Sequence, residues 1–158
     1  MSRTQKKAMR LTKQSNYAVR LLMYCATNEG NISRVSEIAR VYSISDLFLF
    51  KILHPLVQAG MVETIRGRSG GIRLAKGSGE ITLFQVIRIT EENFALSDHL
   101  EGDGACPSSD KYGVSTVFRE ALSAFFRVLS NYTIADLVAA QPNIITLLDL
   151  DPKPRTKP

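Results

Sequence analysis

The segment over residues 62–74 constrains the fold of this chain more than any other part of the sequence. Two short strand-like runs flank a tip that contains three glycines, and glycine readily adopts the backbone angles that a tight hairpin turn needs. The segment also carries three arginines: Arg66, Arg68 and Arg73. The pattern predicts a β-hairpin whose positive charge contacts a polyanion, and an ordinary solvated hairpin is the alternative.

Three helices are expected before this hairpin, over residues 12–28, 34–41 and 45–60. The first has an apolar stripe at helical spacing from Ala18 to Cys25, so Cys25 is expected to be a core residue. Ser45 is a good N-cap for the third helix, and Gly60 is a good stop signal. Pro55 inside that helix predicts a kink or a tighter last turn. A helix followed by an arginine-tipped hairpin predicts a winged helix-turn-helix whose third helix enters the major groove of DNA.

The second half of the chain has a different pattern. A helix capped by Thr82 is expected through residue 89, and residues 91–113 then lose all periodicity. The longest helix, over residues 114–131, carries apolar residues at three-four spacing and is followed by a short helix capped by Thr133. The apolar stripe of the long helix favours a dimer seam over packing within one chain. The predicted fold is mainly α with a small β wing: a winged helix-turn-helix plus a long dimerisation helix.

The charged residues also differ between the two halves of the chain. Residues 1–76 hold 13 lysines and arginines against 4 acidic residues, whereas residues 77–158 hold 7 against 11. This asymmetry suggests that only the first half meets a nucleic acid. We therefore expect a disordered extension over residues 1–8, a DNA-binding domain over residues 9–80, a sensor loop and dimerisation helices over residues 81–140, and a flexible tail over residues 141–158.

Several classes of protein are excluded on the sequence alone. No apolar run approaches the roughly 18 residues of a membrane span and the start lacks a signal peptide, so a cytoplasmic protein without a membrane partner is expected. Two cysteines are too few for a disulfide framework. No hydrolytic constellation, phosphate-binding glycine loop or paired metal-binding histidines are present, so the chain is not expected to be an enzyme.

Five short segments together resemble one family: residues 9–12 (MRLT), 17–19 (YAV), 37–39 (EIA), 49–53 (LFKIL) and 66–71 (RGRSGG). With the order of the predicted elements, they are similar to the Rrf-two family of winged-helix transcription regulators over nearly the whole chain. Within that family, residues 49–56, 80–84 and 132–137 are nearest to the iron-responsive repressors. The resemblance implies a homodimer that binds double-stranded DNA at a palindromic operator.

Many members of this family carry an iron–sulfur cluster held by three cysteines in the loop before the long helix. In the matching loop of this chain only Cys106 is a cysteine, and His99 lies near the expected first ligand. Because such clusters need about four ligands, no cofactor is expected, and a cluster held by Cys106, His99 and partner residues is the alternative. Cys106 could otherwise be a redox-sensing thiol or a family remnant without a task. The signal sensed could be iron, a redox change or a small ligand.

The predicted site residues form three groups. The expected DNA contacts are Thr12, Lys13, Gln14 and Tyr17 on the first helix, Ser45, Asp46, Leu47, Phe48 and Lys51 on the third helix, and Arg66, Arg68, Ser69, Gly70 and Arg73 on the hairpin. The expected dimer contacts are Val117, Phe118, Ala121, Phe125 and Val128. The sensor candidates are Cys106 and His99. The sequence predicts a sequence-specific regulator, most simply a repressor; the alternative is an interaction module that binds an enzyme partner through the acidic half.

Overall fold

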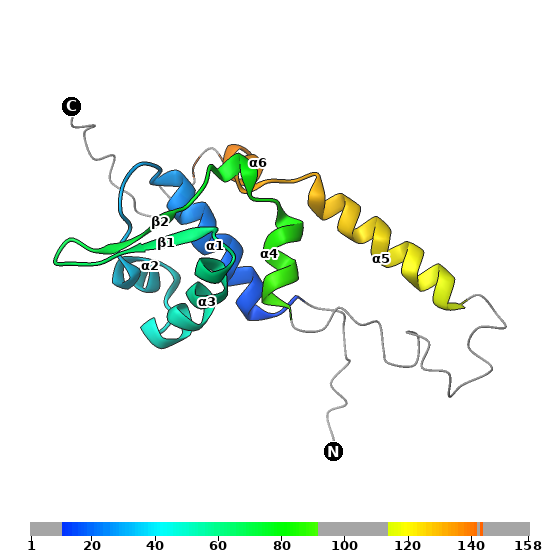
Figure 1. The fold of residues 1–158 in the computed structure, drawn as a ribbon, viewed down its shortest axis with the longest axis horizontal. Helices are drawn as coiled ribbons and strands as arrows, with labels where there is room; N and C mark the ends of the chain where they lie inside the picture. Colours follow the sequence, from blue (N-terminus) through cyan, green and yellow to red (C-terminus); the bar gives the residue numbers. More distant parts are fainter. Residues whose placement is uncertain (1–10, 92–113, 142, 144–158) are drawn as a thin grey trace, which may run out of the picture.

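The computed structural model describes residues 11–91, 114–141 and 143. Its elements follow in the order α1 (Lys13–Thr27), α2 (Val35–Tyr42), α3 (Asp46–Gln58), β1 (Val62–Ile65), β2 (Gly71–Leu74), the 3-10 turn η1 (Ser78–Glu80), α4 (Leu83–Thr90), α5 (Val114–Ser130) and α6 (Ile134–Ala139). The fold is mainly helical with one two-stranded antiparallel sheet, which confirms the predicted fold class (Figure 1). The predicted N-terminal extension, most of the predicted sensor loop and nearly all of the tail lie outside the described residues.

Helix starts follow the capping residues of the sequence. The hydroxyl of Ser45 accepts a hydrogen bond from the backbone N–H of Phe48, and Thr12 does the same for Ser15. Thr82 and Thr133 each form a reciprocal capping box with the residue three positions later. Such caps satisfy backbone N–H groups that have no partner inside the helix. The predicted caps Ser45, Thr82 and Thr133 are therefore confirmed.

Helices α2 and α3 are joined by a tight turn, as in a helix-turn-helix. Ser43 adopts a left-handed conformation with φ 52°, and the N–H of Ile44 donates to the carbonyl of Ala39 at 3.0 Å. Helix α3 continues past Pro55 to Gln58. At its end the N–H of Gly60 donates to Val57 three residues earlier, so the last turn is tighter than an α-helical turn.

The two strands form the predicted wing, with Val62 opposite Leu74 and Ile65 opposite Gly71. Only Gly67 in the wing has a positive φ, at 111°. Gly71 is required for a different reason: a Cβ there would lie 2.3 Å from the carbonyl oxygen of Ser33. Ser33 and Ile72 exchange two backbone hydrogen bonds of 2.8 Å, so the wing is fixed to the segment before α2.

Helix α1 lies at the centre of the core. Its residues Ala18, Leu21 and Leu22 are fully buried, and the helix contacts α3, α4, α6 and β2. Cys25 is 2% exposed within the same cluster, which confirms it as a core residue. The C-terminal α6 joins this core because the N–H of Ile134 donates to the carbonyl of Ile81 at 2.9 Å. The winged helix and α6 thus form one packed body.

Helix α5 is arranged differently. Its main packing partner among the described elements is α4, with an edge-to-face contact between Phe84 and Phe126 whose ring centroids are 5.1 Å apart. It extends from the body on the side opposite the tip of the wing (Figure 1).

Candidate nucleic-acid interface

The first turns of α3 present one face to solvent. Leu47 is 82% exposed and Phe50 is 53% exposed, and Asp46 and Lys51 are exposed beside them. Residues three and four apart lie on the same helix face, so these side chains form one surface, which we call the α3 face. Lys51 supplies its positive charge and Asp46 its negative charge.

Phe48 lies away from the α3 face. It is half-buried, and its ring meets that of Tyr17 edge-on with centroids 5.8 Å apart. The predicted set therefore included Phe48, which packs against α1, and missed Phe50, which is exposed. The spacing of the four buried residues of α3 was the available signal, because it defines the buried face of the helix and leaves Phe50 outside that face: Leu49, Ile52, Leu53 and Leu56.

An open hollow lies between the start of α2, the start of α3 and the wing tip. Three predicted contact residues line it: Asp46, Arg68 and Gly70. Three residues outside the predicted set line it as well: Arg34, Ser36 and Phe50. The structure therefore brings the wing and the third helix together, as predicted. Arg34 is the N-cap residue of α2, and a helix N-terminus attracts anions, which was the available signal.

The start of α1 joins this surface through aromatic contacts. Tyr17 packs edge-on against both Phe48 and Tyr42, and the guanidinium of Arg20 lies 5.7 Å from the centre of the Tyr17 ring. Lys13 is exposed and Gln14 is half-buried. The aromatic cluster fixes the predicted contact residues of α1 relative to the start of α3.

A carboxylate ties the same end of α1 to the end of α4. Oε1 of Glu91 accepts the N–H of Thr12 at 2.7 Å and the hydroxyl of Ser15. The Ser15 hydroxyl also lies 2.7 Å from that of Thr90, and both residues are buried. Charge-assisted hydrogen bonds are the stronger ones, and a negative charge is favoured at a helix N-terminus. Sequence reasoning missed this cluster, which we call the Glu91 clasp, because its members lie about 75 residues apart.

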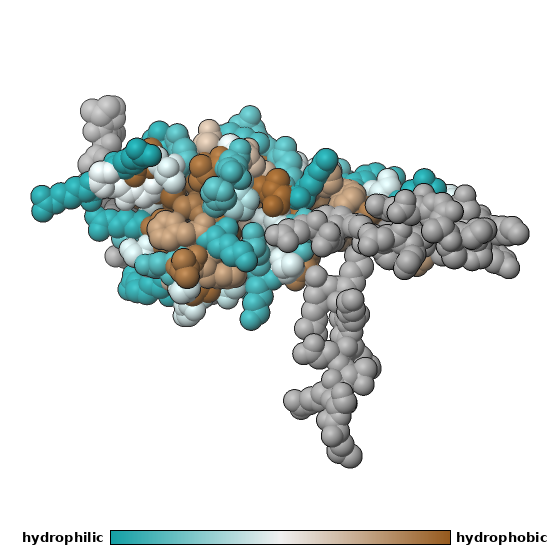
Figure 2. Space-filling model, turned by 60° about the horizontal axis from the view of Figure 1, so that its bottom comes forward, coloured by the Kyte–Doolittle hydropathy of each residue, from teal (hydrophilic) through white to brown (hydrophobic). Residues whose placement is uncertain are grey.

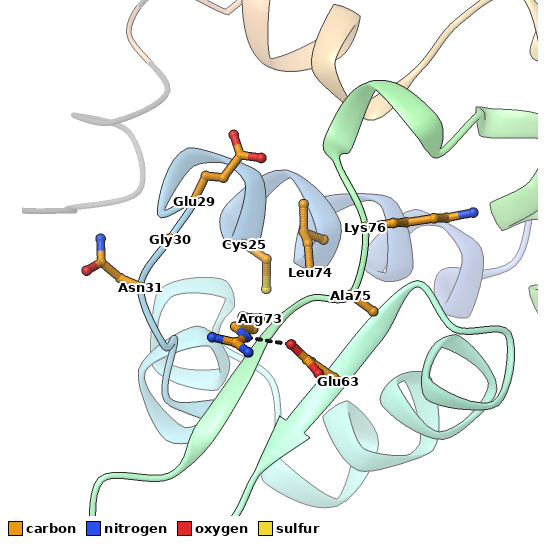
Figure 3. A pocket seen from close by; sticks show the side chains of 9 residues that line it. All are labelled: Cys25, Glu29, Gly30, Asn31, Glu63, Arg73, Leu74, Ala75 and Lys76. Atoms are coloured by element: carbon orange, nitrogen blue, oxygen red, sulfur yellow. Dashed lines mark hydrogen bonds and ion pairs between the residues drawn. The ribbon is translucent and has the colours of Figure 1, made fainter.

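The arginines of the wing differ in their surroundings. Arg66 and Arg68 are exposed near its tip. Arg73 forms an ion pair with Glu63 on the neighbouring strand and lines a pocket beside Cys25, away from the hollow that Arg68 lines (Figure 3). The paired carboxylate offsets part of the charge of Arg73, so Arg68 is the better placed of the two to meet a polyanion.

The predicted sensor residues Cys106 and His99 lie outside the described residues. The other thiol, Cys25, has a pKa raised to about 12 by burial, which a hydrogen bond with Ser33 opposes. A thiol with so high a pKa is protonated at neutral pH and is a poor nucleophile. Within residues 11–91, 114–141 and 143, no group of three or more His, Cys, Asp or Glu residues is placed to hold a metal ion.

Four of the five predicted dimer residues are exposed on α5. Val117 is 65% exposed, Phe118 is 43% exposed and Val128 is 54% exposed. Ala121 is also exposed, whereas Phe125 is half-buried with its ring 5.8 Å from that of Phe126.

In the part of the chain that the structure describes, no helix is long and apolar enough to cross a membrane.

Comparisons with known proteins agree with this geometry. The model of the Rrf2 family, described as "Iron-dependent Transcriptional regulator", matches residues 11–140. Protein aau3 of Rhizobium meliloti (strain 1021) is 57% identical over 144 residues, which cover 90% of this chain and 94% of that protein. The HTH-type transcriptional regulator NsrR of Bacillus subtilis (strain 168) is 39% identical over 144 residues, which cover 90% of this chain and 99% of that protein.

A solved structure shows the same fold. CymR (YrzC), the global cysteine regulator of B. subtilis, is similar with a TM-score of 0.71 and 22% identity, over 84% of this chain and 98% of that one. The predicted nearness to iron-responsive repressors stays a prediction. The family match and the similarity to named regulators confirm the prediction of a DNA-binding regulator rather than an enzyme. The chain therefore belongs to the Rrf2 (Rrf-two) family of winged-helix transcription regulators.

Proposed function

We propose that this chain is a homodimeric repressor that binds a palindromic operator and releases it in response to iron, a redox change or a small ligand. The observation that carries the proposal is the juxtaposition of the α3 face with Arg68 and Arg34 around one hollow. A helix with exposed side chains at its start can enter the major groove, while cations on either side neutralise phosphates.

Each contact has its own task in this proposal. Lys51, Arg34, Arg66 and Arg68 contact phosphate oxygens and hold the protein in register. The carboxylate of Asp46 accepts a hydrogen bond from a cytosine amino group in the major groove. Lys13, Gln14 and Tyr17 anchor the start of α1 to the backbone of the same half-site. Phe48 supports Tyr17 through their ring contact and does not itself reach a base.

Dimerisation follows from α5. A stripe of exposed apolar side chains on a helix that projects from the body is a surface that a second copy of the same helix can cover. Two copies then place two α3 faces on the two halves of a palindrome.

The family description names iron, and Cys106 and His99 are the residues of this chain that we propose as sensor candidates. They lie in the segment that joins α4, and hence the Glu91 clasp, to α5. A signal received in that segment can alter the position of α1 against DNA or the position of one subunit against the other.

The test is a salt titration of binding to operator and to random duplex DNA. The wild-type affinity should fall steeply with salt, because each phosphate contact contributes a slope of about −0.9 in log K against log salt. Arg68→Ala should weaken binding to all sequences alike and reduce the slope by about one. Arg88→Ala removes an exposed arginine of α4, whose guanidinium lies 5.8 Å from the centre of the Phe84 ring, and is the control outside the proposed interface, with no change in the salt slope expected. A flat salt response, or an unchanged slope for Arg68→Ala, would contradict the proposed interface.

A further inference from the structure

Two large apolar side chains stand exposed on the α3 face. Leu47 is 82% exposed and Phe50 is 53% exposed, and they lie three residues apart on one side of the helix. The other large apolar residues of α3 are buried or half-buried, so these two are not needed for its packing. Their exposure has no explanation in the fold of a single chain.

The surroundings of this pair indicate its partner. Phe50 lines the hollow with Arg34, Arg68 and Asp46, and Lys51 follows it on the helix. Figure 2 shows hydrophobic residues set among hydrophilic ones on the face of the body that it turns forward. An apolar protein or lipid surface would have to desolvate these charges, whereas double-stranded DNA offers phosphates for the cations and a small apolar group in the groove between them.

That apolar group is the 5-methyl group of thymine. It is the apolar group that the bases present in the major groove. A side chain that contacts it distinguishes thymine from cytosine without a hydrogen bond. Asp46 beside Leu47 disfavours a phosphate at this point of the surface and favours the base edges.

We infer that Leu47 and Phe50 are specificity-determining residues that read the 5-methyl groups of thymines in the operator. The inference rests on the proposed function, since it requires the α3 face to enter the major groove. Burial of one methyl group on an apolar side chain should change the dissociation constant by about fourfold. Two contacts per half-site then supply a distinct part of the sequence preference, independent of the hydrogen bond assigned to Asp46.

The test replaces thymine by uracil, which removes the methyl group and leaves every hydrogen-bonding group in place. An operator selected from a randomised duplex pool is substituted one thymine at a time, and its affinity for the wild-type protein is measured. At the contacted thymines the substitution should weaken binding about fourfold. 5-Bromouracil, whose bromine is close to a methyl group in size, should restore it.

Variants assign each methyl group to its side chain. Phe50→Ala should bind the thymine operator more weakly than wild type and should no longer distinguish thymine from uracil at one position. Leu47→Ala should do the same at a neighbouring position. Gln58→Ala, at the exposed far end of α3, is the control that should keep both discriminations. Both test residues are solvent-exposed, so unchanged melting curves should accompany the loss.

The outcomes separate the inference from the function on which it rests. Sequence-specific binding that is insensitive to every uracil substitution would overturn the inference and leave the proposed function standing. The same would follow if Phe50→Ala and Leu47→Ala kept the wild-type discrimination. A wild-type protein that binds no duplex in preference to another would overturn both.

Discussion

Leu21 in α1 is fully buried, whereas Val117 in α5 is 65% exposed, although both belong to apolar stripes at the same helical spacing. The stripe of α1 is covered by α3, α4, α6 and β2 of the same chain. Four of the five predicted dimer residues on the stripe of α5 are exposed, although Phe126 of the same helix contacts α4. Hydrophobic periodicity thus identifies an apolar helix face, and does not say whether the same chain covers that face.

The largest expected effect is on the free energy of unfolding, and it differs between the stripe of α1 and the stripe of α5. Leu21→Ala should lower the free energy of unfolding by about 2–5 kcal/mol, because it leaves a cavity in a packed core. Val117→Ala should leave the stability at high dilution unchanged and lower it only at concentrations where the chain is a dimer. Chemical denaturation at several protein concentrations measures both. Equal losses at all concentrations would show that the stripe of α5 is covered within one chain.

A smaller effect is expected at the Glu91 clasp, which joins the start of α1 to the segment that leads to α5. Glu91→Gln removes the charge that Thr12 and Ser15 donate to, and hydrogen bonds to charged groups contribute about 1.5–3 kcal/mol. The first turn of α1 should exchange its amide hydrogens faster, and operator affinity should fall. Glu29→Gln, an exposed carboxylate at the other end of α1, is the control. Unchanged exchange in that turn would show that the clasp does not hold α1.

Much of the fold could be predicted from the sequence because its signals are local. Caps such as Ser45 and Thr133 act on residues three positions away, and apolar spacing defines each helix face. The Glu91 clasp could not be predicted, since its hydroxyls and carboxylate are polar residues that only the tertiary fold brings together. The proposed DNA contacts stay a prediction; the structure adds that Phe48 is half-buried and Phe50 is exposed, which depends on the phase of α3 against α1. Gly71 was selected for its conformational freedom, but its reason is the backbone of Ser33, a non-local contact.

The smallest expected effect concerns the ionisation of the buried Cys25 thiol. Because burial raises the pKa of Cys25 from 9.0 to about 12, its thiol should stay protonated and unlabelled at pH 8 in the folded protein. The unfolded thiol ionises at lower pH, so ionisation of Cys25 favours unfolding as the pH rises from about 9 to about 12. In Cys106→Ser, where Cys25 is the one cysteine left, a thiol reagent should label no cysteine in the native protein and one after denaturation.

Cys106→Ser should also keep operator binding in reductant and lose any response to mild peroxide, if Cys106 is the redox sensor. A native protein labelled at Cys25 would contradict the burial of that thiol. A peroxide response that survives in Cys106→Ser would assign the sensing to another group.

The central claim is that the α3 face of each chain binds DNA while α5 joins two chains. The most direct test compares the affinity for a full palindrome with the affinity for a single half-site. Phe118→Asp places a charge in the proposed seam, while Ser123→Asp, on the opposite side of α5, is its control. Wild type and Ser123→Asp should bind the palindrome about 10²–10⁴-fold more tightly than the half-site. Phe118→Asp should sediment as a folded monomer, lose that advantage and keep the half-site sequence preference. A Phe118→Asp protein that binds the palindrome as tightly as wild type, or that no longer recognises the half-site, would contradict the account.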